Sequence, residues 1–186
     1  MKPRWLVLAG AWVALAAAVH LGAVWALPRL IMQRVLGQVG TEQAAGGVLQ
    51  PPLVDHTQRR VVMPSPDLLY ALCTIDLGQG PWRVRAQADR PGRDGYWSVA
   101  LYAANTDNFH VVGDRDLGGT PLDLLVLPPD ASAAPRAGDA GTPGQRSVRA
   151  PSDRVLLLMR VLVGDPARDL AGAEAARRTL RCEPVR

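Results

Sequence analysis

The clearest pattern along the chain is one long apolar segment near its start, from Trp5 to Leu27. No charged residue lies between Arg4 and Arg29, and the one strongly polar side chain in this interval is His20. A helix over these residues would be about 34 Å long at ~1.5 Å per residue, enough to cross the hydrocarbon core of a bilayer with some tilt. Because the segment also lacks the polar face of a soluble helix, the pattern predicts a transmembrane helix.

A cleaved secretory signal is the alternative for the same segment. Lys2 and Arg4 give it a basic start, and residues 24–26 (Val-Trp-Ala) offer a small-residue cleavage pattern. However, the apolar stretch is longer than the roughly 7–15 residues of a typical signal core, which favours an uncleaved anchor over residues 1–28. Both interpretations send the rest of the chain to the same side of the membrane.

Beyond the anchor, apolar and polar residues alternate in short runs that predict β-strands. Residues 82–88 and 96–103 alternate with a period of two, and turn residues lie between them, so we expect a hairpin. Residues 68–77 are apolar on both alternating faces, which favours a strand buried on both sides, although so short a run also fits a helix. Further strands are expected at residues 109–112, 122–127 and 154–163.

The end of the chain predicts a helix. Asp165 and Pro166 supply an N-cap and a proline at the first helical position, and residues 167–181 are rich in helix formers. Leu170, Ala173 and Leu180 are expected to face the core, with Arg177 and Arg178 in water. The fold class predicted is therefore mainly β, an antiparallel sheet or sandwich, with a C-terminal α-helix and one N-terminal transmembrane helix.

The connections divide the chain into three expected parts. The anchor at 1–28 is followed at 29–60 by a juxtamembrane helix and a linker, the linker beginning with the Gly- and Ala-rich stretch at 40–52. Residues 61–186 form a single β-rich domain. Within it, the Pro-, Gly- and Ala-rich stretch 128–151 is expected to be a long surface loop.

Charge and composition exclude one large class of function. The formal net charge is +4, but setting aside Lys2 and Arg4 before the membrane segment leaves only a slight basic surplus. The pairs Arg59-Arg60 and Arg177-Arg178 are isolated, without a long basic run or interleaved aromatic residues. We therefore expect no binding to nucleic acid.

The two cysteines bear on the compartment. Cys73 and Cys182 are far apart in the chain, and neither has the close second cysteine or histidine of a redox or zinc motif. A pair at this separation is most useful as a disulfide, which persists in an oxidising compartment such as the periplasm. Two unrelated buried thiols are the alternative.

Several of these stretches together resemble the bacterial family called domain of unknown function 1254. In the first half, the matching residues are 65–70, Cys73, Asp76-Leu77, 96–99, Tyr102 and 105–109; in the second half, they are 149–152, Asp165-Pro166 and 182–184. The resemblance implies a β-rich domain facing the periplasm, in a family without an established activity. Larger members carry a second domain, domain of unknown function 1214, so the resemblance implies a separately encoded companion for this short, membrane-anchored form.

Candidate binding residues are few. Asn105, Asp107 and Asn108 form the most polar cluster of the domain, which fits a backbone-bonding turn better than a carbohydrate or metal contact. Asp67 directly precedes the apolar strand at 68–77, and Tyr70 lies within it. A structural role, such as capping the start of the strand by Asp67, would also explain these residues. These five residues are the candidate ligand site, and no catalytic residue is assigned.

No cofactor or metal is expected. Beyond the membrane segment the histidines are His56 and His110, too few to close a zinc site. Residues 114–118 begin like a calcium loop, but Gly118 takes the place of the third ligand, so a solvated turn fits better.

Three functions remain after these exclusions. The first is a non-enzymatic, single-pass envelope protein anchored in the inner membrane, with a periplasmic domain that binds a separately encoded partner. The second is an envelope enzyme or a binding protein for a small, sugar-like ligand at residues 105–108. The third is an inert stabilising subunit of a membrane complex.

Overall fold

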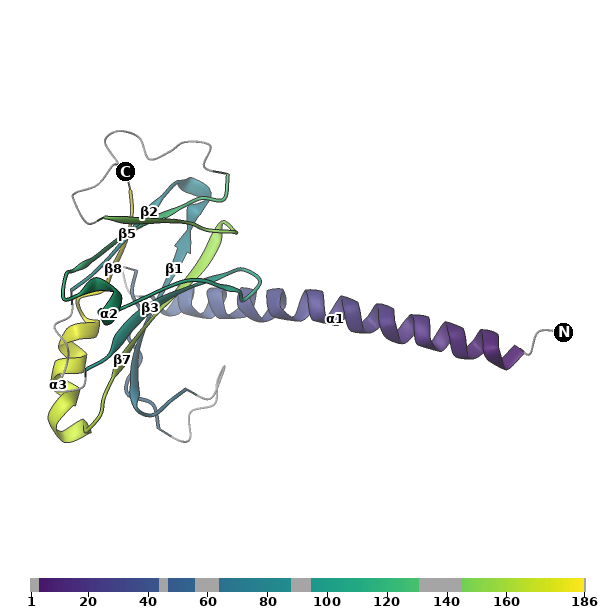
Figure 1. The fold of residues 1–186 in the computed structure, drawn as a ribbon, viewed down its shortest axis with the longest axis horizontal. Coiled ribbons are helices and arrows are strands. Elements are labelled where there is room, and N and C mark those ends of the chain that lie inside the picture. The colour runs from purple at the N-terminus through teal and green to yellow at the C-terminus, as the bar shows by residue number, and fades with distance from the viewer. Residues whose placement is uncertain (1–3, 44–46, 56–63, 88–94, 131–144, 186) are drawn as a thin grey trace.

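The computed structural model of the chain describes residues 4–43, 47–55, 64–87, 95–130 and 145–185. In these residues eight strands form two four-stranded sheets, one facing the other, and a long helix projects to one side (Figure 1). The prediction of a mainly β fold with a C-terminal helix and one long apolar N-terminal helix is therefore confirmed.

The first sheet is antiparallel throughout and the second is mixed. The first contains, in spatial order, β1 (Leu68–Asp76), β7 (Arg154–Leu162), β3 (Trp97–Ala103) and β4 (Asn108–Gly113). The second contains β6 (Arg146–Arg149), β5 (Leu122–Leu127), β2 (Trp82–Ala86) and β8 (Arg181–Pro184), with β5 and β6 parallel.

The core lies between the two sheets, because each strand turns every second side chain inward. β1 shows the alternation directly, since its odd-numbered residues from Leu69 to Ile75 are buried and the residues between them are only half-buried. The buried cluster combines inward residues of both sheets, among them Leu101, Leu124, Leu157 and Met159. Full burial of each such side chain stabilises the fold by about 1.5–3 kcal/mol, so this layer supplies most of the driving force.

Short helices cover the ends of the strands. α3 (Pro166–Arg177) begins at Asp165, whose carboxylate accepts a hydrogen bond of 3.0 Å from the Ala167 amide, as the sequence predicted. A 3₁₀ turn, η1 (Leu77–Gln79), begins in the same way at Asp76, which accepts from the Gly78 amide.

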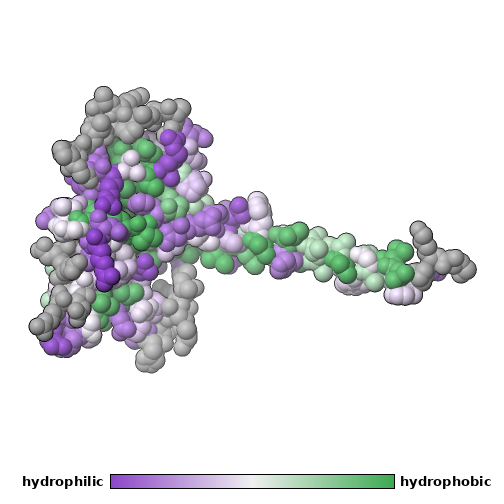
Figure 2. Space-filling model, in the orientation of Figure 1, coloured by the Kyte–Doolittle hydropathy of each residue, from purple (hydrophilic) through white to green (hydrophobic). Residues whose placement is uncertain are grey.

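The N-terminal helix α1 (Arg4–Glu42) is continuous through Pro28 and longer than the sequence predicted. Its first part is apolar and exposed, and Figure 2 shows this apolar surface along the outer part of the projecting helix. Its last turns lie on the outer face of the first sheet. There Met32, Leu36 and Val39 recur at helical spacing and bury themselves against that sheet.

Polar contacts fix the end of α1 to the neighbouring strand. Gln43, just after the helix, accepts a hydrogen bond of 2.9 Å from the Thr74 hydroxyl of β1 and donates one of 3.1 Å to the Gly47 carbonyl. Leu49 then pairs with Leu72 of β1 as an isolated antiparallel bridge. The stretch 40–52, predicted as a linker, is thus helical at its start and bonded to the sheet where it is described.

The predicted hairpin between residues 82–88 and 96–103 is wrong. β2 belongs to the second sheet, between β5 and β8, whereas β3 belongs to the first sheet, between β7 and β4. A period of two identifies the face that a strand buries but not the strand beside it.

Three smaller expectations also need correction. The C-terminal helix ends at Arg177, and β8 follows it, so the prediction of one helix to residue 181 is wrong. β6 lies inside the stretch 128–151 predicted as loop, of which residues 131–144 are outside the described part. The predicted solvated turn at 114–118 is the helical turn α2 (Asp114–Leu117), with Asp114 buried.

Candidate functional site

The polar cluster at residues 105–108 forms the tight connection between β3 and β4. The Asn105 amide donates to the Asp107 carboxylate, and the Asp107 backbone N–H donates to Asn105 Oδ1 over 3.3 Å. Thr106 adopts a left-handed conformation, with φ of 74°, between two backbone hydrogen bonds that join Ala103 to Thr106 and to Asp107. Most of the polarity in the cluster therefore serves the turn itself.

A cavity of about 260 Å³ lies where this turn approaches α1. It is lined by two helix residues, Arg29 and Gln33, and by residues of two loops: Ala104, Asn105, Pro151 and Ser152. Ser152 joins the two loops, since its hydroxyl accepts a 2.9 Å hydrogen bond from the Ala104 amide and donates one of 2.9 Å to the Arg154 carbonyl. We call this space the juxtamembrane pocket, because it begins where the apolar part of α1 ends.

Arg29 is the charged residue of the juxtamembrane pocket. Its guanidinium carbon lies 4.3 Å from the centre of the Trp25 ring, one turn earlier, and one of its nitrogens donates to the Trp25 carbonyl. In the described part of the chain Arg29 has no ion pair with a carboxylate. The cation is therefore oriented by an aromatic ring and a carbonyl, with further N–H donors that can reach a ligand.

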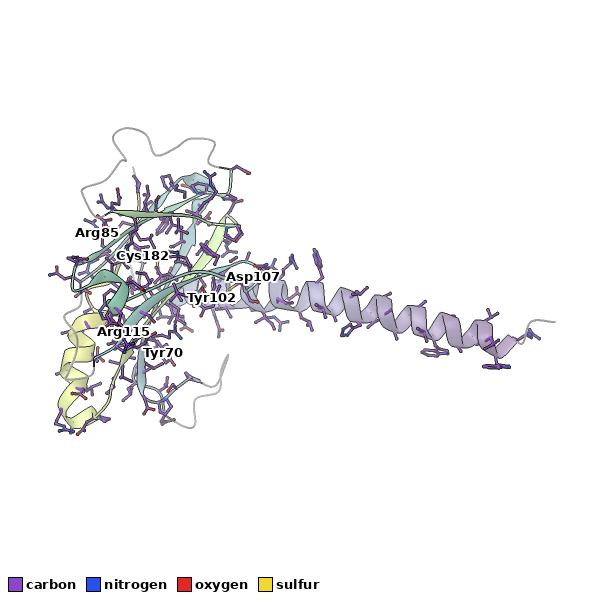
Figure 3. All side chains as sticks on the ribbon, viewed as in Figure 1. Tyr70, Arg85, Tyr102, Asp107, Arg115 and Cys182 are labelled. Atoms are coloured by element: carbon purple, nitrogen blue, oxygen red, sulfur yellow. The ribbon has the colours of Figure 1, made fainter. Side chains whose placement is uncertain are left out.

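The other two candidate residues, Asp67 and Tyr70, lie elsewhere. In the first sheet Tyr70 lies opposite Arg160 of β7, whereas Ala103, just before the turn, lies opposite Val155 of the same strand. These two positions on β7 are five residues apart, which places Tyr70 and the turn about 16 Å from each other along the sheet. Figure 3 likewise shows Asp107 and Tyr70 separated from each other. The structure therefore does not bring the five candidate residues together as one site.

Both residues have local partners at their end of the sheet. The Tyr70 hydroxyl accepts a hydrogen bond of 2.9 Å from the Ser65 amide, and the Asp67 carbonyl accepts one of 2.8 Å from the Val163 amide. These bonds fix the entry to β1 against the end of β7.

Arg177 is a structural residue that the sequence analysis placed wrongly in water. Its side chain is 7% exposed and makes a two-point ion pair with Glu174, with N–O distances of 2.7 and 2.8 Å. The same guanidinium donates to the carbonyls of Tyr70 and Pro51, which fastens α3 to β1 and to the segment after α1. The i,i+3 spacing of Glu174 and Arg177 was the available signal for this pair.

The two cysteines meet in the core, between the sheets. Cys73 is on β1 of the first sheet and Cys182 is on β8 of the second; both are free, buried thiols, so this structure does not contain the predicted disulfide. Burial raises the pKa of Cys182 well above its usual value, and a hydrogen bond with Cys73 raises it further. The Cys182 thiol is consequently neutral at neutral pH, and it lies beside the Cys73 thiol.

His110 on β4 is the one histidine of the domain that the structure describes. Burial lowers its pKa, the charge of Arg146 lowers it further, and Asp116 acts in the opposite direction. Its Nε2 atom is buried without a hydrogen-bond partner. Within the described ranges no group of three metal-ligating side chains occurs, and His56 lies outside those ranges.

Comparisons with known proteins bear on the two-sheet domain that follows α1. The family model described as "Protein of unknown function (DUF1254)" matches residues 48–184, so the chain belongs to this family. No protein of curated function shows a significant match.

The solved structures that are similar to the chain include the following two. One is a crystal structure of a protein from Vibrio parahaemolyticus, with a TM-score of 0.60 at 14% identity, covering 85% of this chain and 35% of that one. The other is an uncharacterised protein from Burkholderia cenocepacia, with a TM-score of 0.46 at 20% identity, covering 88% and 41%. The chain thus spans little more than a third of the length of the first, and at this identity the likeness shows the fold alone.

Proposed function

We propose that the chain is a single-pass envelope protein of the inner membrane, anchored by α1, with a periplasmic domain that binds a separately encoded partner. The observation that carries this proposal is the coverage of the Vibrio structure. The region that the two proteins share covers 85% of this chain but 35% of the Vibrio chain. The Vibrio protein therefore has a large additional part that this chain does not match. A partner on a second polypeptide, such as the companion domain that larger family members carry, would supply the equivalent of that additional part.

The course of α1 supports an uncleaved anchor. Leu27 ends the apolar segment, and Met32, just over one turn later, is already buried against the sandwich. Cleavage after Ala26 would leave Pro28 near a new N-terminus and would discard the apolar half of a helix whose other half is part of the fold. We therefore propose that the anchor, residues 1–28, stays joined to residues 29–60 and to the domain at 61–186.

The cysteine pair supports the periplasmic placement. Cys73 and Cys182 face each other from different sheets, so a bond between them would join the sheets across the core. We propose that the pair is oxidised to a disulfide in the periplasm, each thiol losing one hydrogen to the oxidising machinery there. Mass analysis after denaturation in alkylating agent without reductant is expected to show an unmodified chain lighter by two hydrogens. Two alkylated cysteines would contradict this placement.

Co-purification from detergent extracts of the native membranes tests the partner. The bait is the full chain, and the matched control keeps residues 1–60 but carries an unrelated soluble domain in place of 61–186. We expect a companion protein in stoichiometric amount with the full chain and not with the control. A full chain that elutes alone as a monomer would contradict the proposal, and degradation of this chain when the companion is deleted would favour a stabilising-subunit role.

A second candidate function is binding of a small polar or sugar-like ligand near residues 105–108. It is favoured by the position of Asn105 on the wall of the juxtamembrane pocket. The separation of Asp67 and Tyr70 from that pocket confines this candidate to the α1 end of the domain. Replacing Asp107 and Asp67 together should then reduce sugar binding no more than replacing Asp107 alone, as measured by calorimetry.

A further inference from the structure

We propose that the juxtamembrane pocket binds the phosphate-bearing headgroup of a phospholipid in the membrane that α1 crosses. The proposal rests on the anchoring proposed above, and it assigns to the pocket a ligand that neither the family nor the fold specifies. It follows from the depth of the pocket relative to the bilayer, from the chemistry of its wall and from its size.

The position of the pocket along α1 matches the headgroup layer. Arg29 follows Leu27, which ends the apolar segment that begins at Trp5, by two positions, and Gln33 follows it by six. At ~1.5 Å per residue these side chains begin about 3 to 9 Å beyond the hydrocarbon core. The headgroup region on each side of a bilayer is about 5–8 Å thick, so the helix wall of the pocket lies at the level of the phosphates.

The wall carries the donors that a phosphate requires. The Arg29 guanidinium is planar and permanently charged, and such groups bind phosphate oxygens through two parallel hydrogen bonds. The Trp25 contact holds the guanidinium in place, which lowers the entropic cost of forming those bonds. The side-chain amide of Gln33 lines the same space and supplies neutral N–H donors, and the Asn105 amide, which gives one N–H to Asp107, has its second N–H to add.

The carboxylate of Asp107, in the adjacent turn, lies outside the pocket lining. It accepts a hydrogen bond from the Asn105 amide. The remaining wall residues, Ala104 and Pro151, are apolar, and Ser152 uses its hydroxyl to hold the two loops together. Arg29 is thus the one charged residue among the described residues of the lining, and the hydrogen bond from the Ala104 amide to the Ser152 hydroxyl holds the two loops together beside it.

The size of the pocket fits a headgroup and excludes a whole lipid. Its volume of about 260 Å³ lies below the ~300 Å³ at which pockets for drug-sized ligands begin. The acyl chains would remain outside, along the exposed apolar half of α1 that precedes Arg29. A soluble phosphate ester would be recognised by the same groups but lacks acyl chains, so competition between the two kinds of ligand distinguishes them.

The experiment uses the full chain in nanodiscs of equal parts phosphatidylglycerol and phosphatidylcholine, released gently into a mass spectrometer. We expect one phospholipid per chain to survive activation that removes the others. Arg29→Gln removes the cation, and Gln33→Trp fills the pocket without changing charge. Each variant should reduce the fraction of chains that keep a lipid by about tenfold, the scale of losing one charge-assisted hydrogen bond.

Arg34→Gln is the matched control. Arg34 is exposed on the same helix and does not line the pocket, yet its replacement removes the same charge. It should retain lipid as the wild type does. Equal retention in all variants, or equal loss in Arg34→Gln and Arg29→Gln, would overturn the proposal.

A third arm separates the two sources of phosphate. Glycerol phosphate added in millimolar excess to the detergent-solubilised chain should not displace the bound lipid. Displacement with retention of glycerol phosphate would show a soluble ligand and overturn the lipid assignment. A chain that fails to enter nanodiscs at all would instead contradict the anchoring in the proposed function, so the two failures are distinguishable.

Discussion

The two halves of α1 belong to one continuous helix but are stabilised by different surroundings. In the first half Trp12 is 71% exposed and Leu21 is 68% exposed, although both are strongly apolar. In the second half Leu36 is 2% exposed, because the outer face of the first sheet covers it. The first half is long and apolar enough to cross a membrane, whereas the second finds its apolar environment within the protein. The contrast shows that the exposed apolar segment and the turns packed on the sandwich belong to one continuous helix.

Removing the buried Arg177 tests the sandwich side of this contrast most strongly. Arg177→Ala would leave Glu174 without its partner and free the carbonyls of Tyr70 and Pro51, which tie the segment after α1 to the sheet. Loss of one member of a buried pair typically lowers the free energy of unfolding by about 3–5 kcal/mol. Denaturant unfolding in detergent measures the change, with Arg178→Ala, at an exposed arginine, as the control expected to change little.

Shortening Leu36 tests whether the second half of α1 is part of the folded domain. Leu36→Ala should reduce the free energy of unfolding of the sandwich by about 3 kcal/mol, because it opens a cavity between the helix and the first sheet. Leu21→Ala, at an exposed position of the same helix, should leave that free energy unchanged. Equal effects of the two variants would contradict the division of α1.

A charge in the first half tests the lipid environment. Leu15→Lys places an ammonium near the middle of the apolar segment, at a cost of about 2.5 kcal/mol for insertion into the bilayer. We expect a reduced membrane fraction after carbonate extraction, with an unchanged melting temperature of the sandwich. Gln38→Lys, on an exposed position of the second half, serves as the control and should remain in the membrane fraction.

The smallest expected effect concerns pH. Burial lowers the pKa of His110 in the folded domain below the unfolded value of about 6.5. At pH values between the folded and the unfolded pKa, the folded state therefore binds fewer protons than the unfolded state. The contribution of neutral His110 to stability is therefore complete above about pH 6.5 and is lost as the pH falls through the folded pKa. Melting temperatures from pH 8 to pH 5 measure this decline, and His110→Gln should make it shallower.

Sequence patterns were sufficient where one periodicity decided the structure. The uncharged segment identified the apolar helix, and alternation identified strands such as β3 and β5. The pairing of those strands was not predictable, because alternation carries no information about neighbours, and so the hairpin of β2 with β3 was wrong. β8 was missed because four residues are too few to show a period.

The candidate site was predictable only in part. The polarity of Asn105 and Asp107 marked a turn, which the structure contains. The juxtamembrane pocket could not be predicted from the sequence, because it forms only where α1 continues past Pro28 and two loops that are distant in the sequence meet beside the helix. The role of Arg177 was hidden for a similar reason, since its carbonyl partners come from residues far away in the sequence.

The most direct test of the continuous, two-environment helix is the intact mass of the chain recovered from carbonate-washed membranes. We predict a chain that is found in the membrane pellet and still contains the whole apolar segment from Trp5 to Leu27. A soluble chain that begins after Ala26 would contradict it, because the first half of α1 would then be a transient signal.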